Sequence, residues 1–315
     1  MKRTILTALV AAAMVFATAF TGMAAEFPNK PIDLVVPFAA GGNVDLSCRI
    51  IANEMEKITG KRFTVLNKPG GGAIVGQTYV AVSKPDGYTM LALTSSFVTN
   101  VLGGAASFKK DDFIPVGMYC FDPELIVASE KSGITTYEQF IKAAKERELL
   151  NSTPGFSTSH HVASLVFSEK TGAKFKYLHT NGSAEQTVQL AGGHAEVGMT
   201  TYAGAASLID QGKIKVLAVC DDKRIAAMPN VPTMAELGFP FVYGAYRGIA
   251  VPKNTPKDVV AWLSDNLGKA MKSPSLIEQF KKAGLPITYM DAPSFTKFLD
   301  EDFKSIQGIM HLLKK

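Results

Sequence analysis

Strand-like and helix-like segments alternate along almost the whole chain. Apolar runs at residues 32–38 and 88–94 have the length and composition of strands, and residues 44–59 between them have helical spacing and stop at Gly60. The same alternation continues through residues 125–220. This pattern is typical of parallel sheets that are covered by helices on both faces. The sequence therefore predicts an α/β fold.

The length of the chain, 315 residues, exceeds what one hydrophobic core usually serves, so two domains are expected. Two short strand-like segments, residues 113–121 and 246–252, stand where a block of alternation is complete. A chain that leaves one domain, builds a second and returns needs such paired crossings, which can act as a hinge. We therefore expect a first domain of residues 26–120 plus 247–315 and a second of residues 121–246.

Beyond residue 250 the pattern becomes mainly helical. Residues 256–271, 275–283 and 293–313 are expected as helices around one short strand at residues 287–289. We interpret these helices as a layer that closes the fold.

The first 25 residues have the features of a secretory signal peptide. Lys2 and Arg3 precede an apolar stretch at residues 5–20, and small residues end the region. The apolar stretch is too short to span a bilayer comfortably. We expect cleavage near Ala24 or Ala25 and export of the mature protein to the periplasm.

Composition excludes one class of partner and limits the number of disulfides. The formal net charge is +5, two charges of which belong to the leader, and no Lys/Arg run interleaved with aromatic residues supports nucleic-acid binding. The three cysteines, Cys48, Cys120 and Cys220, are an odd number in an exported chain, so at most one disulfide can form. We favour three buried thiols, with a disulfide between Cys120 and Cys220 as the alternative.

Two glycine-bearing turns, at residues 37–45 and 154–160, each follow a strand-like run and open a helix-like one. Such a turn aims unpaired main-chain N–H groups and the positive end of the helix dipole at whatever lies in front of it. Ordinary turn chemistry explains either turn alone, and Asp45 fits a helix N-cap better than a direct ligand contact. Together the turns favour a cleft that grips a carboxylate through these residues: Phe38, Ala40, Gly41, Gly42, Asn43, Asp45, Gly155, Ser157, Thr158 and Ser159.

Two further strand-to-helix turns belong to the same half of the chain as the second glycine turn. They lie at the carboxyl ends of expected strands, which is the edge of an α/β sheet where ligands bind. Capping explains each of them singly, but their number favours binding. We expect these residues to face the same cleft: Thr180, Asn181, Gly182, Thr200, Thr201 and Tyr202.

Motifs for catalysis and for metal or phosphate binding are absent from the sequence. The adjacent His160 and His161 point in different directions on a helix, and no Gly-x-Ser-x-Gly, His-Glu-x-x-His or Cys-x-x-Cys motif occurs. The glycine run at residues 70–72 lacks the Lys-Ser/Thr of a phosphate loop, and we interpret it as a mobile linker. We expect neither an enzyme nor a cofactor nor a metal. A serine hydrolase built on Ser157 is the alternative, because triads are assembled in space.

Several segments, taken in order, resemble the substrate-binding receptors of tripartite tricarboxylate transporters, the Bug family. The resemblance covers nearly the whole mature chain. It is carried by residues 35–38 with Gly41, Gly42 and Asp45, and by residues 67–71, 85–89, 190–193, 212–219, Arg224 and 229–238.

The resemblance implies a two-domain periplasmic-binding-protein fold, a type II-like flytrap with a hinge of two crossing segments. It implies one small organic anion between the domains, contacted by residues 38–45, by residues 155–160 and by Thr94, Ser95 and Ser96. The implied function is delivery of a small carboxylate to the permease subunits of a transporter, and we expect a monomer. A ligand sensor for a membrane signalling partner is the alternative.

Two departures from the family pattern bear on the ligand. Residues 179–182 read His-Thr-Asn-Gly where many members have Pro-Tyr-Lys-Gly, and residues 246–248 read Tyr-Arg-Gly where a tryptophan is frequent. Loss of the lysine makes a triply charged anion less favoured than a mono- or dicarboxylate. The expected ligands are mono-, di- or tricarboxylates, acidic amino acids and aromatic acids.

Overall fold

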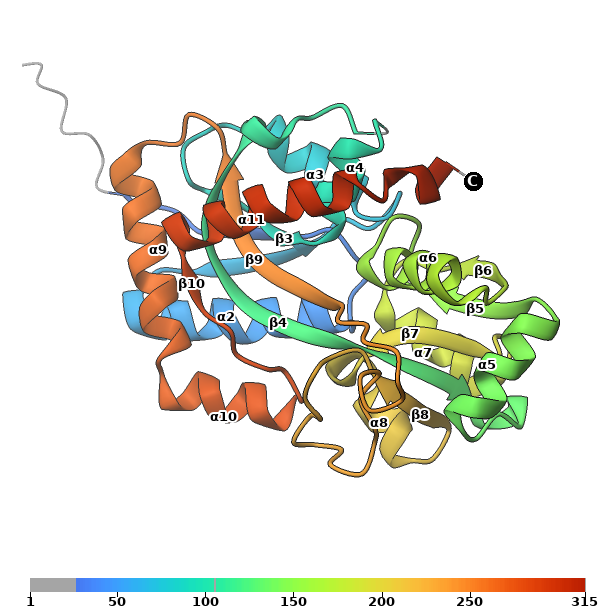
Figure 1. Cartoon of the computed structure of the whole chain (residues 1–315). Helices are drawn as coiled ribbons and strands as arrows, with labels where there is room; N and C mark the ends of the chain where they lie inside the picture. Colours follow the sequence, from blue (N-terminus) through green and yellow to red (C-terminus); the bar gives the residue numbers. More distant parts are fainter. Residues whose placement is uncertain (1–26, 105, 315) are drawn as a thin grey trace, which may run out of the picture.

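The computed structural model describes residues 27–104 and 106–314, so the expected leader lies outside the described residues. Two α/β lobes lie side by side and are joined by two long strands (Figure 1). This is the two-lobed α/β arrangement that the alternation predicted. Among the described residues, no helix combines the length and apolar character that a membrane crossing requires.

The first lobe is built on a sheet in the order β2-β1-β3-β9-β4. Strands β1 (Ile32–Val36), β2 (Phe63–Asn67) and β3 (Thr89–Thr94) run parallel to one another. Strands β1 and β3 are buried along nearly their whole length, because helices cover both faces of this sheet.

Helices from both ends of the chain cover the first lobe. They are α2 (Asn43–Thr59), α3 (Ile74–Ala81), α4 (Ser96–Leu102), α9 (Lys257–Met271), α10 (Pro274–Lys282) and α11 (Ala292–Gln307). Helix α2 packs against α9 and α10, whereas α11 packs against α4 and strand β4. The C-terminal helices therefore close the lobe, as expected.

The second lobe has its own sheet and helices. Strands β5 (Leu149–Thr153), β6 (Phe175–His179) and β7 (Val197–Thr201) are parallel, and β8 (Ile214–Val219) runs antiparallel to β4. The helices are α5 (Tyr137–Glu146), α6 (Ser159–Thr171), α7 (Ser183–Gly192) and α8 (Tyr202–Asp210).

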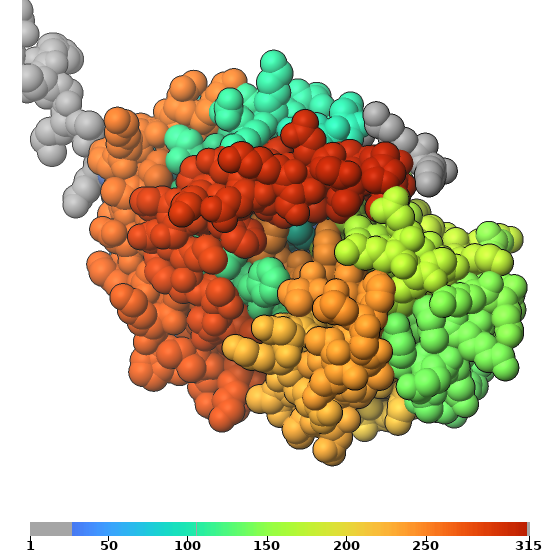
Figure 2. Space-filling view, viewed as in Figure 1, coloured from blue at the N-terminus to red at the C-terminus, as the bar shows by residue number. Residues whose placement is uncertain are grey.

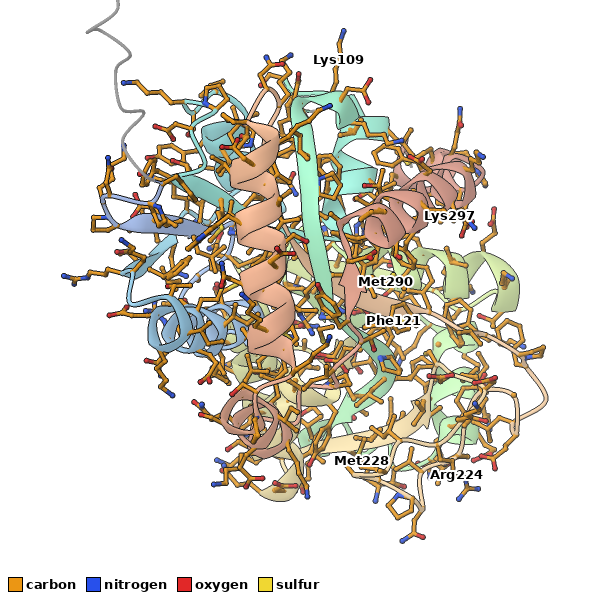
Figure 3. The ribbon with its side chains drawn as sticks, turned by 90° about the vertical axis from the view of Figure 1, so that its left-hand side faces the viewer. Lys109, Phe121, Arg224, Met228, Met290 and Lys297 are labelled. Atoms are coloured by element: carbon orange, nitrogen blue, oxygen red, sulfur yellow. The ribbon has the colours of Figure 1, made fainter. Side chains whose placement is uncertain are left out.

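Two antiparallel strands, β4 (Phe113–Ser129) and β9 (Gly244–Pro252), connect the lobes. Their pairing starts at Phe113 opposite Pro252 and ends at Pro123 opposite Gly244, with two register shifts between. Beyond this point β4 continues into the second lobe and pairs with β7 and β8. Figure 3 shows Phe121 on β4 between Lys109 in the first lobe and Arg224 in the second.

The structure corrects two expected boundaries. The crossing at residues 113–121 and the strand expected at residues 125–128 are one continuous strand, because polar Asp122 and Glu124 interrupt its apolar run without breaking the pairing. The strand expected at residues 287–289 is instead β10 (Met290–Asp291), which pairs with β4.

The C-terminal end of the chain reaches from the first lobe to the second. After α11 the chain forms a 3₁₀ turn at Met310–Lys314 that contacts α6. In the space-filling view α11 lies across the upper part of the face and its end meets α6 (Figure 2). There His311 Nε2 lies 2.7 Å from a carboxylate oxygen of Glu169.

All three cysteines are buried and free. Burial raises the pKa of the Cys48 and Cys120 thiols to about 12. The structure therefore agrees with three buried thiols rather than with a disulfide between Cys120 and Cys220.

Candidate functional site

A cavity lies between the lobes, where several helices begin beside the crossing strands. Its empty volume is about 440 Å³, including the open mouth. The lining comes from the starts of α2, α4, α6 and α7, the preceding turns and strand β9. It consists of Phe38, Gly42, Asn43, Val44, Thr94, Ser95, Ser96, Pro154, Thr158, Ser159, His160, Ser183, Ala245, Tyr246 and Arg247.

The structure brings eight of the predicted site residues to this lining: Phe38, Gly42, Asn43, Thr94, Ser95, Ser96, Thr158 and Ser159. Ser183, which follows Gly182 in the strand-to-helix turn expected at this cleft, also lines it, whereas sequence reasoning did not place Ala245, Tyr246 or Arg247 in the site. No Asp or Glu is among the lining residues. An anion in this cavity therefore touches no carboxylate.

The first glycine turn presents the start of α2 to the cavity. Gly41 has a φ of 83°, a conformation that favours glycine. Gly42 is the N-cap of α2 and has no side chain that could bond the first N–H groups of the helix. Ala40 and Gly41 are exposed and lie outside the lining. Within the described chain, the N–H groups of Gly42 and Val44 donate no hydrogen bond. They are available to a ligand.

Asp45 stabilises this turn from behind. It is the third residue of α2 rather than its N-cap, and its carboxylate accepts hydrogen bonds from Gly41 N (2.9 Å), Arg49 Nε (3.0 Å) and Asn67 Nδ2 (2.9 Å). Burial alone would raise the pKa of Asp45, but these hydrogen bonds outweigh burial and hold it below its usual value. Asp45 does not line the cavity.

The second glycine turn presents the start of α6 in the same way. Thr158 caps the helix without a side-chain bond to it, and its hydroxyl instead donates to Gly155 O at 2.8 Å. Among the described residues, the N–H groups of Ser159 and His160 have no acceptor. Both glycine turns thus expose main-chain donors at one cavity, as the sequence suggested.

Ser157 is turned away from this cavity. Its φ is 63°, its N–H donates to His161 Nδ1 at 3.1 Å, and its carbonyl accepts from Thr99 Oγ1 at 2.5 Å. Burial lowers the pKa of His161 to about 3, so this ring is a neutral acceptor. In the described part of the chain, the Ser157 hydroxyl bonds no histidine or carboxylate, so no serine triad is assembled.

Arg247 is the one Lys or Arg in the lining, and it is only 2% exposed. Its Nη1 donates to Cys120 Sγ at 2.9 Å, and its Nη2 lies 3.3 Å from Asp122 Oδ2. Its Nε makes no hydrogen bond within the described residues. Burial raises the pKa of Asp122 to about 6, although the nearby Arg247 charge and a Thr201 hydrogen bond oppose the shift.

A second buried pair lies beside this one. His160 Nδ1 and Glu124 Oε1 are 2.5 Å apart, and Glu124 is completely buried. The other carboxylate oxygen of Glu124 has no partner among the described residues. The described chain contains no group of three His, Cys, Asp or Glu side chains placed to hold a metal ion.

A second cavity, with an empty volume of about 520 Å³, adjoins the first and shares Phe38 and Pro154 with it. Its remaining lining residues are Pro37, Gly70, Gly71, Gly72, Ala73, Gly155, Phe156, His179, Thr180 and Asn181. The predicted residues Gly155, Thr180 and Asn181 therefore belong to this neighbouring space.

The glycine run at residues 70–72 is a packed wall of the second cavity rather than a linker. A Cβ atom on Gly72 would lie 1.8 Å from Phe156 O, which belongs to the other lobe. Only a glycine permits this close approach of two main chains.

Hydrogen bonds join the lobes directly. Asn43 Nδ2 donates to Thr201 Oγ1 at 3.0 Å, Asn43 N donates to Ser183 Oγ at 3.2 Å, and Ala39 N donates to Asn181 O at 3.0 Å. The predicted residue Thr201 thus holds Asn43 rather than lining the cavity.

The last predicted residues lie behind the cavity. The buried Thr200 hydroxyl has no partner among the described residues, and Gly182 caps α7 close to Ala39. Tyr202, the first residue of α8, packs against Gly284 of the first lobe. These positions depend on how the lobes meet, which local sequence patterns do not reveal.

Known proteins share both the sequence and the fold. Residues 47–314 match the sequence model of the TctC family, which is described as the tripartite tricarboxylate transporter family receptor. The UPF0065 protein of the gbd 5′ region of Cupriavidus necator is 30% identical over 311 residues, which is 94% of either chain.

Two solved structures have the same fold as this chain. Periplasmic binding protein BugD has a TM-score of 0.86 at 26% identity and covers 91% of this chain and 99% of its own. MatC from Rhodopseudomonas palustris, solved with bound malate, has a TM-score of 0.86 at 23% identity, and the match covers 90% of this chain and 100% of MatC. This chain therefore has the periplasmic-binding-protein fold and belongs to the TctC receptors of tripartite tricarboxylate transporters, a family of solute-binding proteins rather than enzymes.

Proposed function

We propose that this protein binds one small carboxylate in the cavity between its lobes and delivers it to the permease subunits of a tripartite transporter. One observation carries the proposal. The N-termini of two long helices, α2 and α6, and the buried residue Arg247 line a cavity that has no acidic lining residue. Helix N-termini and arginines are the groups with which proteins hold carboxylates.

We propose that the ligand contacts the lining residues directly and that the other predicted residues act behind them. The free N–H groups of Gly42, Val44, Ser159 and His160 supply donors from both lobes. Donors from two lobes bind a ligand better when the lobes are together, so the ligand favours closure. Asp45 and Thr201 support this arrangement by holding the α2 turn and Asn43.

The hinge and the location of the protein belong to the same proposal. The moving units are residues 26–120 plus 247–315 and residues 121–246, which rotate about the crossing strands β4 and β9. The leader at residues 1–25 directs the chain to the periplasm, where it acts as a monomer without cofactor. Fractionation of cells that express the full chain or a chain without the leader tests the location.

Isothermal titration calorimetry with paired acids and amides tests the binding function. The panel contains mono-, di- and tricarboxylates, acidic amino acids and aromatic acids, each beside an amide of the same skeleton. We expect at least one acid to bind with a stoichiometry of about one and its amide to bind much more weakly, because the site recognises charge. Absence of heat with every acid, or equal binding of an acid and its amide, would overturn the proposal.

A further inference from the structure

Each side chain of the cavity that can be cationic already faces a buried carboxylate. Arg247 lies 3.3 Å from Asp122, and His160 lies 2.5 Å from Glu124. Asp122 is 2% exposed and Glu124 is completely buried, so solvent does not screen either acid. The side chains around the cavity therefore contribute no net positive charge to a bound anion.

The remaining attraction comes from helix N-termini. Helices α2, α6 and α7 begin at the cavity, and each contributes roughly half a positive charge at its N-terminus. Together they amount to about one and a half positive charges, which offsets one carboxylate fully and a second one only in part. The neighbouring cavity provides no Lys or Arg side chain that could pair with a second one.

The other lining residues carry no charge. Some are polar, among them Asn43, Thr94 and Ser183, and the others form an apolar wall that is suited to an uncharged ligand body. The apolar wall consists of Phe38, Val44, Pro154 and Ala245, with Tyr246 beside them. A second ionised group placed against these side chains would lose its hydration without gaining a partner.

We infer that the site selects a monocarboxylate with an uncharged, largely apolar body over dicarboxylates and tricarboxylates. This inference rests on the proposed carboxylate-binding function and narrows its substrate class. The carboxylate binds at the helix N-termini beside Arg247, and the body of the ligand packs against the apolar wall.

Calorimetry at pH 7.5 with three matched pairs tests the selection: butyrate and succinate, hexanoate and adipate, benzoate and terephthalate. Each pair keeps the skeleton nearly constant and changes the charge from one to two. We expect the monocarboxylate to bind at least tenfold more tightly within every pair that binds.

The outcomes separate the two proposals. A diacid that binds as tightly as its monoacid overturns the selection but leaves the carboxylate receptor intact. Absence of binding by these six acids and by every acid of the wider panel overturns the receptor function, and the selection with it.

An Asp122→Asn variant tests the electrostatic cause. It removes one negative charge beside Arg247 at nearly constant volume. We therefore expect the ratio of the monoacid affinity to the diacid affinity to fall by about tenfold. Asp265→Asn on the exposed side of α9 is the matched control and should leave the preference unchanged. An unchanged preference in a folded Asp122→Asn protein would contradict this cause, and if that variant fails to fold, the wild-type ratios still decide the selection.

Discussion

At the scale of single residues, Arg247 has a structural role, and we propose a binding role beside it. The residue lies on a crossing strand and lines the cavity, and its buried guanidinium donates to Asp122 and Cys120. Burying an ion pair costs desolvation free energy, and that cost is offset only when the geometry and additional hydrogen bonds are good. A bound carboxylate would add such hydrogen bonds to the donors that the chain leaves unused.

Replacing Arg247 by Gln removes the charge and most of the donors. We expect the affinity for the best-binding acid to fall by about ten- to a hundredfold, because a charge-assisted hydrogen bond contributes about 1.5–3 kcal/mol. Arg224→Gln is the matched control, since Arg224 lies at the far end of the second lobe (Figure 3) and bonds Glu236. Calorimetry on folded protein measures both, and wild-type affinity in the Arg247 variant would exclude Arg247 from the site.

The raised pKa of Asp122, about 6, predicts a specific pH dependence of stability. The unfolded side chain has a pKa of about 3.9, so between these values the native state binds the proton that the unfolded state lacks. Relative to Asp122→Asn, the free energy of unfolding of the wild type should therefore rise by about 2 kcal/mol as the pH falls from 7 to 4. Urea unfolding across this range measures the difference, and a difference that stays constant with pH would contradict the raised pKa.

Residues of the site were predictable where the signal is local. Gly42, Asn43 and Ser159 belong to strand–glycine–helix turns, whose exposed amides follow from the chemistry of a helix start. Arg247 reaches the cavity only because a crossing strand is packed there. No local pattern indicates such packing, so sequence reasoning missed it.

At the scale of elements, the contact between the glycine run at residues 70–72 and the turn at Phe156 decides how closely the lobes approach. Gly72 has a φ of 60°, and its missing side chain leaves room for the carbonyl of Phe156. A side chain at this position would hold the two lobes apart.

A Gly72→Ala variant should therefore bind ligand at least tenfold more weakly than wild type, because closure is blocked. Gly60→Ala is the matched control, since Gly60 also has a positive φ, 66°, but has nothing within 4 Å of an added Cβ. Both variants carry a similar backbone strain, so calorimetry separates the contact from the strain. Equal affinities in the two variants would contradict the role of this contact.

Asn43 joins the start of α2 to the starts of α7 and α8 in the other lobe through Ser183 and Thr201. Asn43→Ala removes the side-chain hydrogen bonds, each of which contributes about 1 kcal/mol, so we expect affinity to fall about five- to thirtyfold. Small-angle scattering of the ligand-free protein should show a larger radius of gyration than wild type. The exposed Asn230 provides the control substitution, Asn230→Ala, and an unchanged radius in Asn43→Ala would argue against an interlobe role.

Elements with strong periodicity were predictable, and elements whose form depends on pairing were not. Helices α2 and α6 end at Gly60 and Gly172, and both stops are visible in the sequence. The length of β4 was not visible, because its polar residues Asp122 and Glu124 break the apolar run while β9 and β7 pair with it on either side.

At the scale of the whole molecule, the fold brings two helix-lined lobe edges face to face across a hinge of two strands (Figure 1). The lobes are in contact through main-chain and side-chain hydrogen bonds around the cavity. In the complex that we propose, a ligand of one carboxylate with an apolar body completes the contacts that each lobe presents alone.

A crystal structure with the tightest-binding acid tests this account most directly. We expect the carboxylate between the lobes, within hydrogen-bond distance of N–H groups at the starts of α2 and α6 and of the Arg247 guanidinium. An acid bound outside the cavity, or a carboxylate turned away from both helix starts, would contradict the account.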